Sequence, residues 1–190
     1  MPRIPLPSRD EMNDDQRAVY DRIVSGPRGK IQGPLRAALY NAELADKWSA
    51  LGALLRYRTS LSPRHSEIAI LITGLLGNSP FEWYAHRIEA EKVGVETAVI
   101  EAILARQQPP GLSEADAVVH DYTVELCTHK SVSDAMYTRA LAQFGAKGVV
   151  ELTALVGYYT MVAMTLNCHE IPLPEGIAPA FPLPQHNGLK

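Results

Sequence analysis

The sequence predicts an all-α protein, and three observations support this prediction. Apolar residues recur at helical spacing through most of the chain, and no alternating run of β-branched residues exceeds a few positions. Capping residues and Gly or Pro breaks divide the pattern into segments of helical length. The chain has 190 residues, of which 46% are hydrophobic and 21% charged, enough for one sizeable core. We expect a single helical domain over residues 1–190.

Local start and stop signals define the expected helices in chain order. A capping pair or a proline at the first helical position marks the starts at Ser8 with Glu11, Ser62-Pro63, Ser79-Pro80 and Ser113 with Asp116. Gly26 ends the first helix. The expected helices span residues 9–25, 35–40, 43–58, 63–77, 80–93, 96–106, 114–129, 133–144 and 147–167.

Two stretches are predicted to be non-helical. The segment "SGPRGKIQGP" (25–34) has two Gly-Pro breaks and is typical of a surface loop, either a plain connector or a lid over a pocket. The tail from about residue 170 contains several prolines, so we expect it to run extended. Its apolar residues suggest that it lies on a surface, either its own or a partner's.

Charge and cysteine usage narrow the function classes. The formal net charge is −3 and no block of like charges occurs, so we expect neither a nucleic-acid partner nor a membrane partner. No apolar signal core or eighteen-residue apolar window is evident, and the expected location is cytoplasmic. Cys127 and Cys168 form no Cys-x-x-Cys motif and are expected to be small hydrophobic residues.

The stretch "SPFEWYAH" (79–86) contains the first candidate for chemistry. Glu82 and His86 are four residues apart, so they share one helix face and can contact each other. A carboxylate beside an imidazole fixes its tautomer, which suits a general acid or base. The alternative is structural. With Ser79 as N-cap, Glu82 falls at the capping-box position, and His86 could be a partly buried core histidine.

Glu67 favours the functional interpretation of His86. It lies in the apolar stretch "SEIAILITGLL", where a carboxylate is costly without a partner. Only "GNS" joins this helix to the next, so the two helices must form an antiparallel hairpin that brings Glu67 near His86. A metal site is conceivable here, but one histidine is too few, and no metal is expected. No phosphate loop, Ser-His-Asp order or zinc pattern appears, so we expect no cofactor.

The hairpin segments "YRTSLSPRHSEIAIL" and "SPFEWYAHRIEAEKVGV" resemble the carboxymuconolactone decarboxylase family, which includes the AhpD-like alkylhydroperoxidases. The family pattern of Glu-x-x-x-His, a small residue and Gly corresponds to Glu82, His86, Ala90 and Gly94. The stretch "GAKGVVELTALVGYYTMVAMTLN" looks like the next helix of the longer members, so the resemblance spans residues 9–173. It implies an AhpD-like helical domain that forms homotrimers or homohexamers, with its active site near the central hairpin.

The resemblance also bears on the reaction. In the peroxidase branch, a Cys-x-x-Cys pair lies at the start of the second hairpin helix, with a proton-relay Glu before it and a proton-relay His after it. The resemblance places the two cysteine positions at Ser79 and Glu82, and the relay Glu and His at Glu67 and His86. Peroxide reduction needs a thiolate and a resolving thiol, which serine and glutamate cannot supply. The decarboxylase branch also lacks the pair. Its reaction removes CO2 from a lactone and reprotonates the resulting carbanion or dienolate, which requires an acid and no metal or organic cofactor.

The resulting hypothesis is a cofactor-free acid–base enzyme acting on a small carboxylated or lactone substrate, with decarboxylation as the best single reaction. His86 would donate or accept the proton, and Glu67 and Glu82 would orient it. Trp83 and Tyr84 are candidate pocket walls. The cations expected to hold a substrate carboxylate are Arg64, Arg87 and Arg28. Two alternatives remain open: a thiol peroxidase using Cys127 or Cys168, and a non-catalytic oligomeric binding protein.

Overall fold

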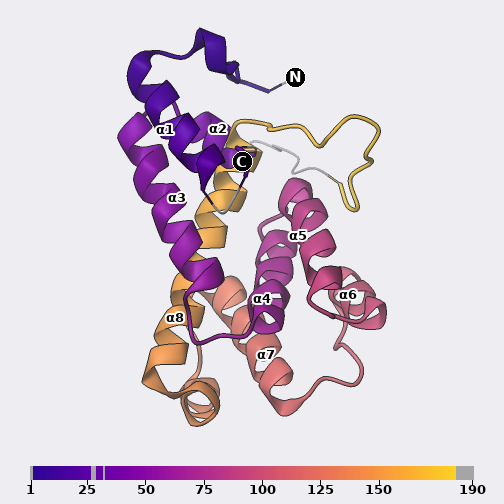
Figure 1. Ribbon diagram of the computed structural model, residues 1–190. Helices are drawn as coiled ribbons and strands as arrows, with labels where there is room; N and C mark the ends of the chain where they lie inside the picture. The colour runs from indigo at the N-terminus through magenta and orange to yellow at the C-terminus, as the bar shows by residue number, and fades with distance from the viewer. Residues whose placement is uncertain (1, 27–28, 32, 183–190) are drawn as a thin grey trace, which may run out of the picture.

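The computed structural model describes residues 2–26, 29–31 and 33–182, and all regular structure within them is helical (Figure 1). The prediction of an all-α fold is confirmed. The elements are η1 (Arg9–Glu11), α1 (Asp14–Ser25), α2 (Pro34–Ala38), α3 (Ala42–Tyr57), α4 (Pro63–Leu76), α5 (Pro80–Lys92), α6 (Thr97–Leu104), α7 (Glu114–His129) and α8 (Asp134–Cys168).

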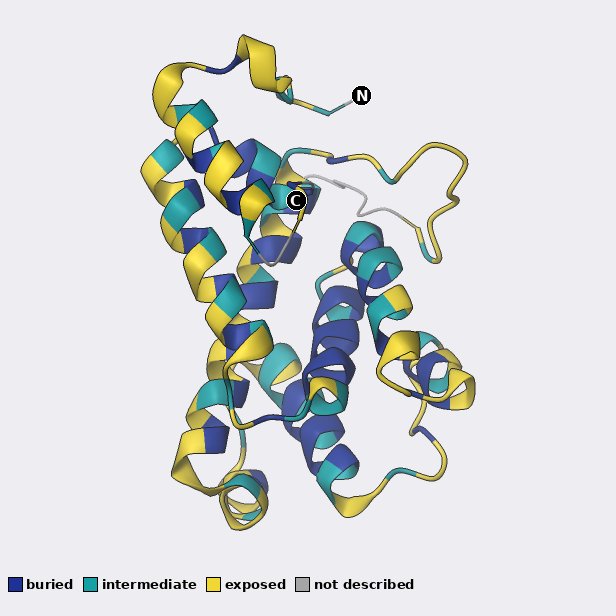
Figure 2. Ribbon diagram, in the orientation of Figure 1, coloured by how far each residue is buried: buried dark blue, intermediate teal, exposed yellow. Residues whose placement is uncertain are grey.

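Helix α4 lies at the centre of the molecule. Every residue from Ser66 to Leu75 is buried, as the dark blue α4 of Figure 2 shows. Helices α5, α7 and α8 pack around α4, whereas α1 and α2 pack on α3. Helix α8 contacts both groups. The sequence explains this position, because α4 is apolar on all sides and must therefore be surrounded by other helices.

The predicted hairpin of α4 and α5 is confirmed. Three residues join the helices, and Asn78 adopts a left-handed conformation (φ 48°) in the turn. Gly74 lets the helices approach closely, since a Cβ added there would lie 3.1 Å from the Cβ of Glu82. The turn and the glycine together fix α4 against the first turns of α5.

The first expected helix begins later than predicted. Ser8 and Glu11 do form a capping box, but it caps only the short η1 turn. Helix α1 starts at Asp14 with its own capping box, made by Asn13 and Gln16. The prediction of a helix from residue 9 was wrong because two capping boxes follow each other and the first one nucleates a single turn.

The predicted break between residues 144 and 147 is present. Gly145 interrupts α8 with a non-helical backbone (φ 63°, ψ 175°), so this long element is two helices joined at a kink. By length and composition, α8 could cross a membrane, but half of its most apolar window is buried inside this fold. A core helix gives the same signal, which makes it weak evidence for a membrane span.

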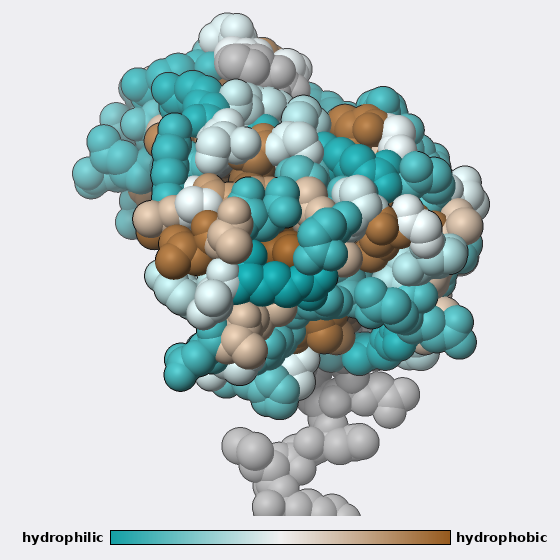
Figure 3. Space-filling view, turned by 90° about the horizontal axis from the view of Figure 1, so that it is seen from below, coloured by the Kyte–Doolittle hydropathy of each residue, from teal (hydrophilic) through white to brown (hydrophobic). Residues whose placement is uncertain are grey.

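The described part of the tail after α8 is non-helical, with a turn at residues 174–177, and it passes over the α5 end of the molecule (Figure 1). It is anchored at Ile171, which is buried, and at Phe181, whose ring lies 6.1 Å from that of Trp83. The face of the molecule seen in Figure 3 is mostly hydrophilic, with apolar side chains in separate small areas.

Candidate active site

The hairpin places His86 between two glutamates, one from each helix. His86 Nδ1 lies 2.6 Å from Glu67 Oε2 on α4, and His86 Nε2 lies 3.4 Å from Glu82 Oε2 one turn earlier on α5. All three side chains are buried, with 6–8% of their surface exposed. The expected proximity of Glu67 and His86 across the hairpin is confirmed. A buried carboxylate and imidazole at this distance satisfy each other's hydrogen-bonding needs.

The capping interpretation of Glu82 is wrong. Ser79 makes no side-chain capping hydrogen bond to the described part of the chain. Its backbone (φ −110°, ψ 90°) differs from that of Ser62 (φ −66°, ψ 154°) and Ser113 (φ −62°, ψ 162°), whose hydroxyls do cap their helices. Ser79 therefore does not cap α5 with its hydroxyl. Glu82 faces His86 instead.

A cavity of about 590 Å³ opens beside this cluster, and both Glu82 and His86 line it. Helices α3, α5 and α8 form most of its walls, while Lys30 from the 25–34 loop and Pro174 from the tail also reach it. The volume suits a small organic molecule. An imidazole flanked by two carboxylates is thus buried in the protein yet lines a space that a small molecule could occupy.

Tyr159 on α8 completes the surroundings of His86. The two rings meet edge to face, with centroids 4.9 Å apart. Burial raises the pKa of Tyr159 well above its usual value, and Glu82 and Glu67 raise it further, although Arg56 opposes them. The phenol therefore stays protonated at neutral pH. Tyr158 and Tyr159 are both buried, and both also line the cavity.

Arg56 on α3 is the cation that sequence reasoning missed. Its Nη2 lies 3.6 Å from Glu67 Oε1 and 4.0 Å from Glu89 Oε2, and its guanidinium lies over the ring of Tyr57 at 5.2 Å. Burial lowers the pKa of Arg56, but Tyr159, Glu67 and the other acidic groups outweigh it and raise the pKa overall. A charge within the apolar run "LGALLRY" is the same signal that singled out Glu67.

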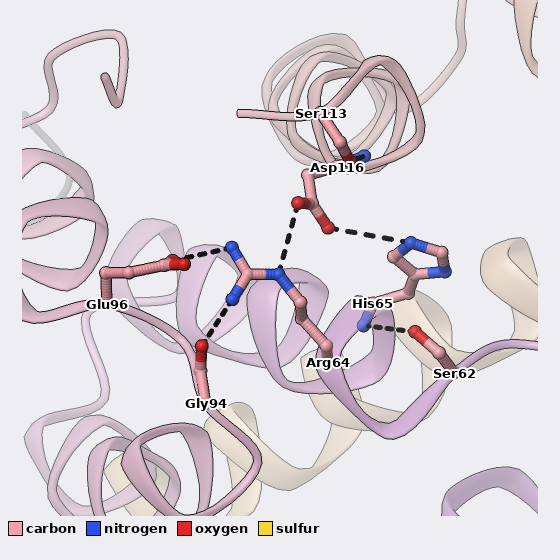
Figure 4. A network of polar contacts seen from close by, with 7 residues as sticks. All are labelled: Ser62, Arg64, His65, Gly94, Glu96, Ser113 and Asp116. Carbon is pink, nitrogen blue, oxygen red and sulfur yellow. Dashed lines mark hydrogen bonds and ion pairs between the residues drawn. The ribbon is translucent and has the colours of Figure 1, made fainter. Parts of the chain in front are cut away.

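Arg64 lies in a different polar network, away from the cavity (Figure 4). Its guanidinium contacts Asp116 on α7 at 3.1 Å and Glu96 at 2.7 Å, and it also donates to the carbonyl of Gly94. His65 approaches the same Asp116 at 3.5 Å. The network ties the start of α4 to α7 and to the segment before α6. Arg64 therefore connects elements of the fold and does not line the cavity.

Of the other described residues predicted to bind substrate, one lines the cavity and the rest do not. Tyr84 lines the cavity, whereas Trp83 points into the core with 1% of its surface exposed. Arg87 is outside the cavity wall and pairs with Glu91 and Glu101. Arg28 lies outside the described residues.

Neither cysteine lies in the cavity wall. Cys127 is partly buried on α7 next to Thr73, and burial raises the pKa of its thiol, which lowers the thiolate fraction. Cys168 is exposed at the end of α8. Within the described part of the chain, no group of three or more His, Cys, Asp or Glu side chains is arranged to hold a metal ion.

No protein-family model matches the sequence, and neither does any curated protein sequence. Solved structures do match the fold. An uncharacterized peroxidase-related protein from Silicibacter sp. TM1040 has a TM-score of 0.75 at 14% identity, covering 90% of this chain and 91% of its own. An uncharacterized peroxidase-related protein with an alkylhydroperoxidase AhpD core, from Ralstonia eutropha JMP134, has a TM-score of 0.75 at 12% identity, with coverages of 92% and 93%.

The debrominase Bmp8, solved in complex with 2,3,4-tribromopyrrole, is a third such structure. Its TM-score is 0.74 at 11% identity, covering 91% of both chains. The chain therefore has the AhpD-like fold, which confirms the fold implied by the family resemblance of the hairpin. Its buried Glu–His–Glu cluster lies on the central hairpin of that fold.

Proposed function

We propose that this protein is a cofactor-free acid–base enzyme that acts on a small carboxylated or lactone substrate, with decarboxylation as its reaction. The observation that carries the proposal is the contact of His86 with two buried glutamates at the wall of a cavity. Burial and a fixed hydrogen-bond partner are what position a general acid or base.

We place the transferable proton between His86 and Glu82. If Nδ1–H of His86 donates to Glu67, a neutral imidazole turns its Nε2 lone pair toward Glu82 Oε2, 3.4 Å away. A proton on either Nε2 or Glu82 would turn this contact into a hydrogen bond. The pair of His86 and Glu82 would therefore hold one proton at the cavity wall, which is the proton that the reaction needs.

Decarboxylation uses that proton as follows. The bond between the substrate carboxylate and its neighbouring carbon breaks, CO2 leaves, and the electron pair remains on that carbon, delocalised into an adjacent carbonyl. His86 Nε2 delivers the proton to the carbon, and water restores it for the next cycle. Glu67 would hold the imidazole in one tautomer throughout. Tyr159, neutral because its pKa is raised, could donate a hydrogen bond to the developing oxyanion.

The fold neighbours support small-molecule chemistry, since one of them was solved with tribromopyrrole. They include peroxidase-related proteins, but thiol chemistry is disfavoured here. By the family resemblance, Ser79 and Glu82 would stand where the peroxidases have their cysteine pair. Neither Cys127 nor Cys168 lines the cavity. We further propose that the protein self-associates and that the cytoplasm is its location.

The test is CO2 release from carboxymuconolactone and related vinylogous acids by wild type and by His86→Gln. We expect turnover by wild type and a loss of about 10²–10⁴-fold in the variant, the usual contribution of a positioned acid or base. Circular dichroism must show that the variant is folded. Absence of CO2 release by wild type on all these acids would overturn the decarboxylase proposal.

A further inference from the structure

The guanidinium of Arg56 on α3 is mostly buried, but its ion pairs with described neighbours are long. Its guanidinium offers five N–H donors, yet it makes no hydrogen bond with any described residue. Its ion pairs with Glu67 and Glu89 are loose, at 3.6 and 4.0 Å. Only 17% of the side chain is exposed, so bulk water satisfies these donors poorly. The exposed part of Arg56 faces the cavity.

The carboxylates around Arg56 are engaged elsewhere. Glu67 makes its short contact with His86, at 2.6 Å. Glu89 accepts a hydrogen bond from Lys92 at 2.8 Å, and Lys92 holds the pKa of Glu89 below its usual value. The loose ion pairs and the ring of Tyr57 fix the position of the guanidinium without using up its donors. A planar fork held in this way is suited to bidentate binding of a carboxylate.

Two lysines also line the cavity, but neither matches Arg56. Lys92 is 62% exposed and already paired with Glu89, and Lys30 is exposed on the 25–34 loop. Arg56 is less exposed than either lysine, and both Arg56 and His86 contact Glu67. A carboxylate bound to Arg56 would therefore bring its substrate beside the proton-transfer group.

We infer that Arg56 binds a carboxylate of the substrate and thereby selects organic acids over neutral molecules of the same shape. This inference rests on the proposed function for its link to His86. The bound carboxylate is one that the product retains, because pairing the departing carboxylate with Arg56 would stabilise the ground state and slow the loss of CO2. Arg56 is thus a specificity-determining residue, and His86 acts on a different part of the substrate.

The test is a binding measurement that needs no turnover. We would titrate wild type by calorimetry at pH 7.5 with benzoate and with its neutral isostere benzamide. We expect benzoate to bind more tightly than benzamide. In Arg56→Met, benzoate affinity should fall by about ten- to a hundredfold, the value of a charge-assisted hydrogen-bonded pair, and benzamide affinity should not change.

The controls separate binding from folding. Arg87→Met removes an arginine of α5 that pairs with Glu91 and Glu101 outside the cavity wall, so benzoate affinity should be unchanged. Arg56→Lys keeps the charge without the planar fork and should give an intermediate affinity even if Arg56→Met does not fold.

Two results would overturn the inference: wild type that does not prefer benzoate to benzamide, or benzoate affinity that is the same in wild type and in both Arg56 variants. If only the proposed function is wrong, wild type would release no CO2 but would still bind benzoate in preference to benzamide.

Discussion

The stability of the hairpin should depend on Glu67 more than on any exposed charge of α5. Both of its carboxylate oxygens are engaged, Oε2 by His86 Nδ1 at 2.6 Å and Oε1 by Arg56 Nη2 at 3.6 Å. The side chain is buried within the otherwise apolar α4. We predict that Glu67→Ala destabilises the protein strongly and that Glu67→Gln does so moderately.

The expected loss in the free energy of unfolding depends on which groups each variant leaves without a partner. Glu67→Ala leaves His86 and Arg56 without this acceptor in a buried setting, which costs about 3–5 kcal/mol of the free energy of unfolding. A protein of this size loses about 2–4 °C of Tm per kcal/mol, so the expected drop in Tm is about 6–20 °C. Glu67→Gln keeps a neutral acceptor of the same shape, and the loss of the charge costs about 1–2 kcal/mol.

Differential scanning calorimetry at pH 7.5 measures both variants. The matched control is Glu91→Ala, which removes an exposed carboxylate from α5 that pairs with Arg87 at 3.2 Å. Exposed pairs contribute about 0–1 kcal/mol, so this variant should melt close to wild type. If Glu67→Ala melted at the same temperature as Glu91→Ala, the contact of Glu67 with His86 would not hold the hairpin, and the argument from burial would be refuted.

Three further predictions concern other parts of the molecule. Burial lowers the pKa of His65 below its usual 6.5, so the unfolded chain binds a proton that the folded protein does not. The free energy of unfolding by urea should therefore decrease as pH falls below about 6.5, and less steeply in His65→Gln. If the acid–base proposal holds, turnover should be unchanged in Cys127→Ser and Cys168→Ser; its loss in either one would revive the thiol peroxidase hypothesis. Met164, 66% exposed on a face of α8 with Val150 and Met161, should contribute to self-association. Met164→Glu should then give a smaller particle by light scattering, and an unchanged mass would exclude this face.

Local signals were sufficient to predict the hairpin and the core of the site. The three-residue link forces α4 and α5 to run antiparallel, and a carboxylate in an apolar helix demands a partner nearby. Together they predicted the contact of Glu67 with His86 from sequence positions alone. Such inferences succeed because both residues belong to neighbouring helices whose relative placement the turn determines.

Local sequence signals did not identify Arg56 as the arginine that lines the cavity. Arg56 reaches the cavity because α3 packs beside α8, and residues distant in the sequence decide that packing. Arg64, close to Glu67 in sequence, was the natural candidate, but Asp116 on α7 and Glu96 engage it. Ser79 also looked like a cap by residue type, but its backbone conformation differs from that of the serines that do cap helices, and it makes no capping hydrogen bond.

The distinction between a structural cluster and an active site can be argued from energetics. Replacing a buried ionic group by well-packed apolar residues is often neutral or stabilising, so stability alone gives weak reason to retain Glu67, Glu82 and His86 inside an apolar hairpin. A structural cluster also needs no space beside it, yet this one lines a cavity of about 590 Å³. Joint replacement of the three by apolar residues separates the two explanations. A non-catalytic structural cluster predicts that a folded variant keeps the ligand binding of wild type and that neither protein turns substrate over, whereas an active site predicts that wild type has turnover and that the folded variant loses it.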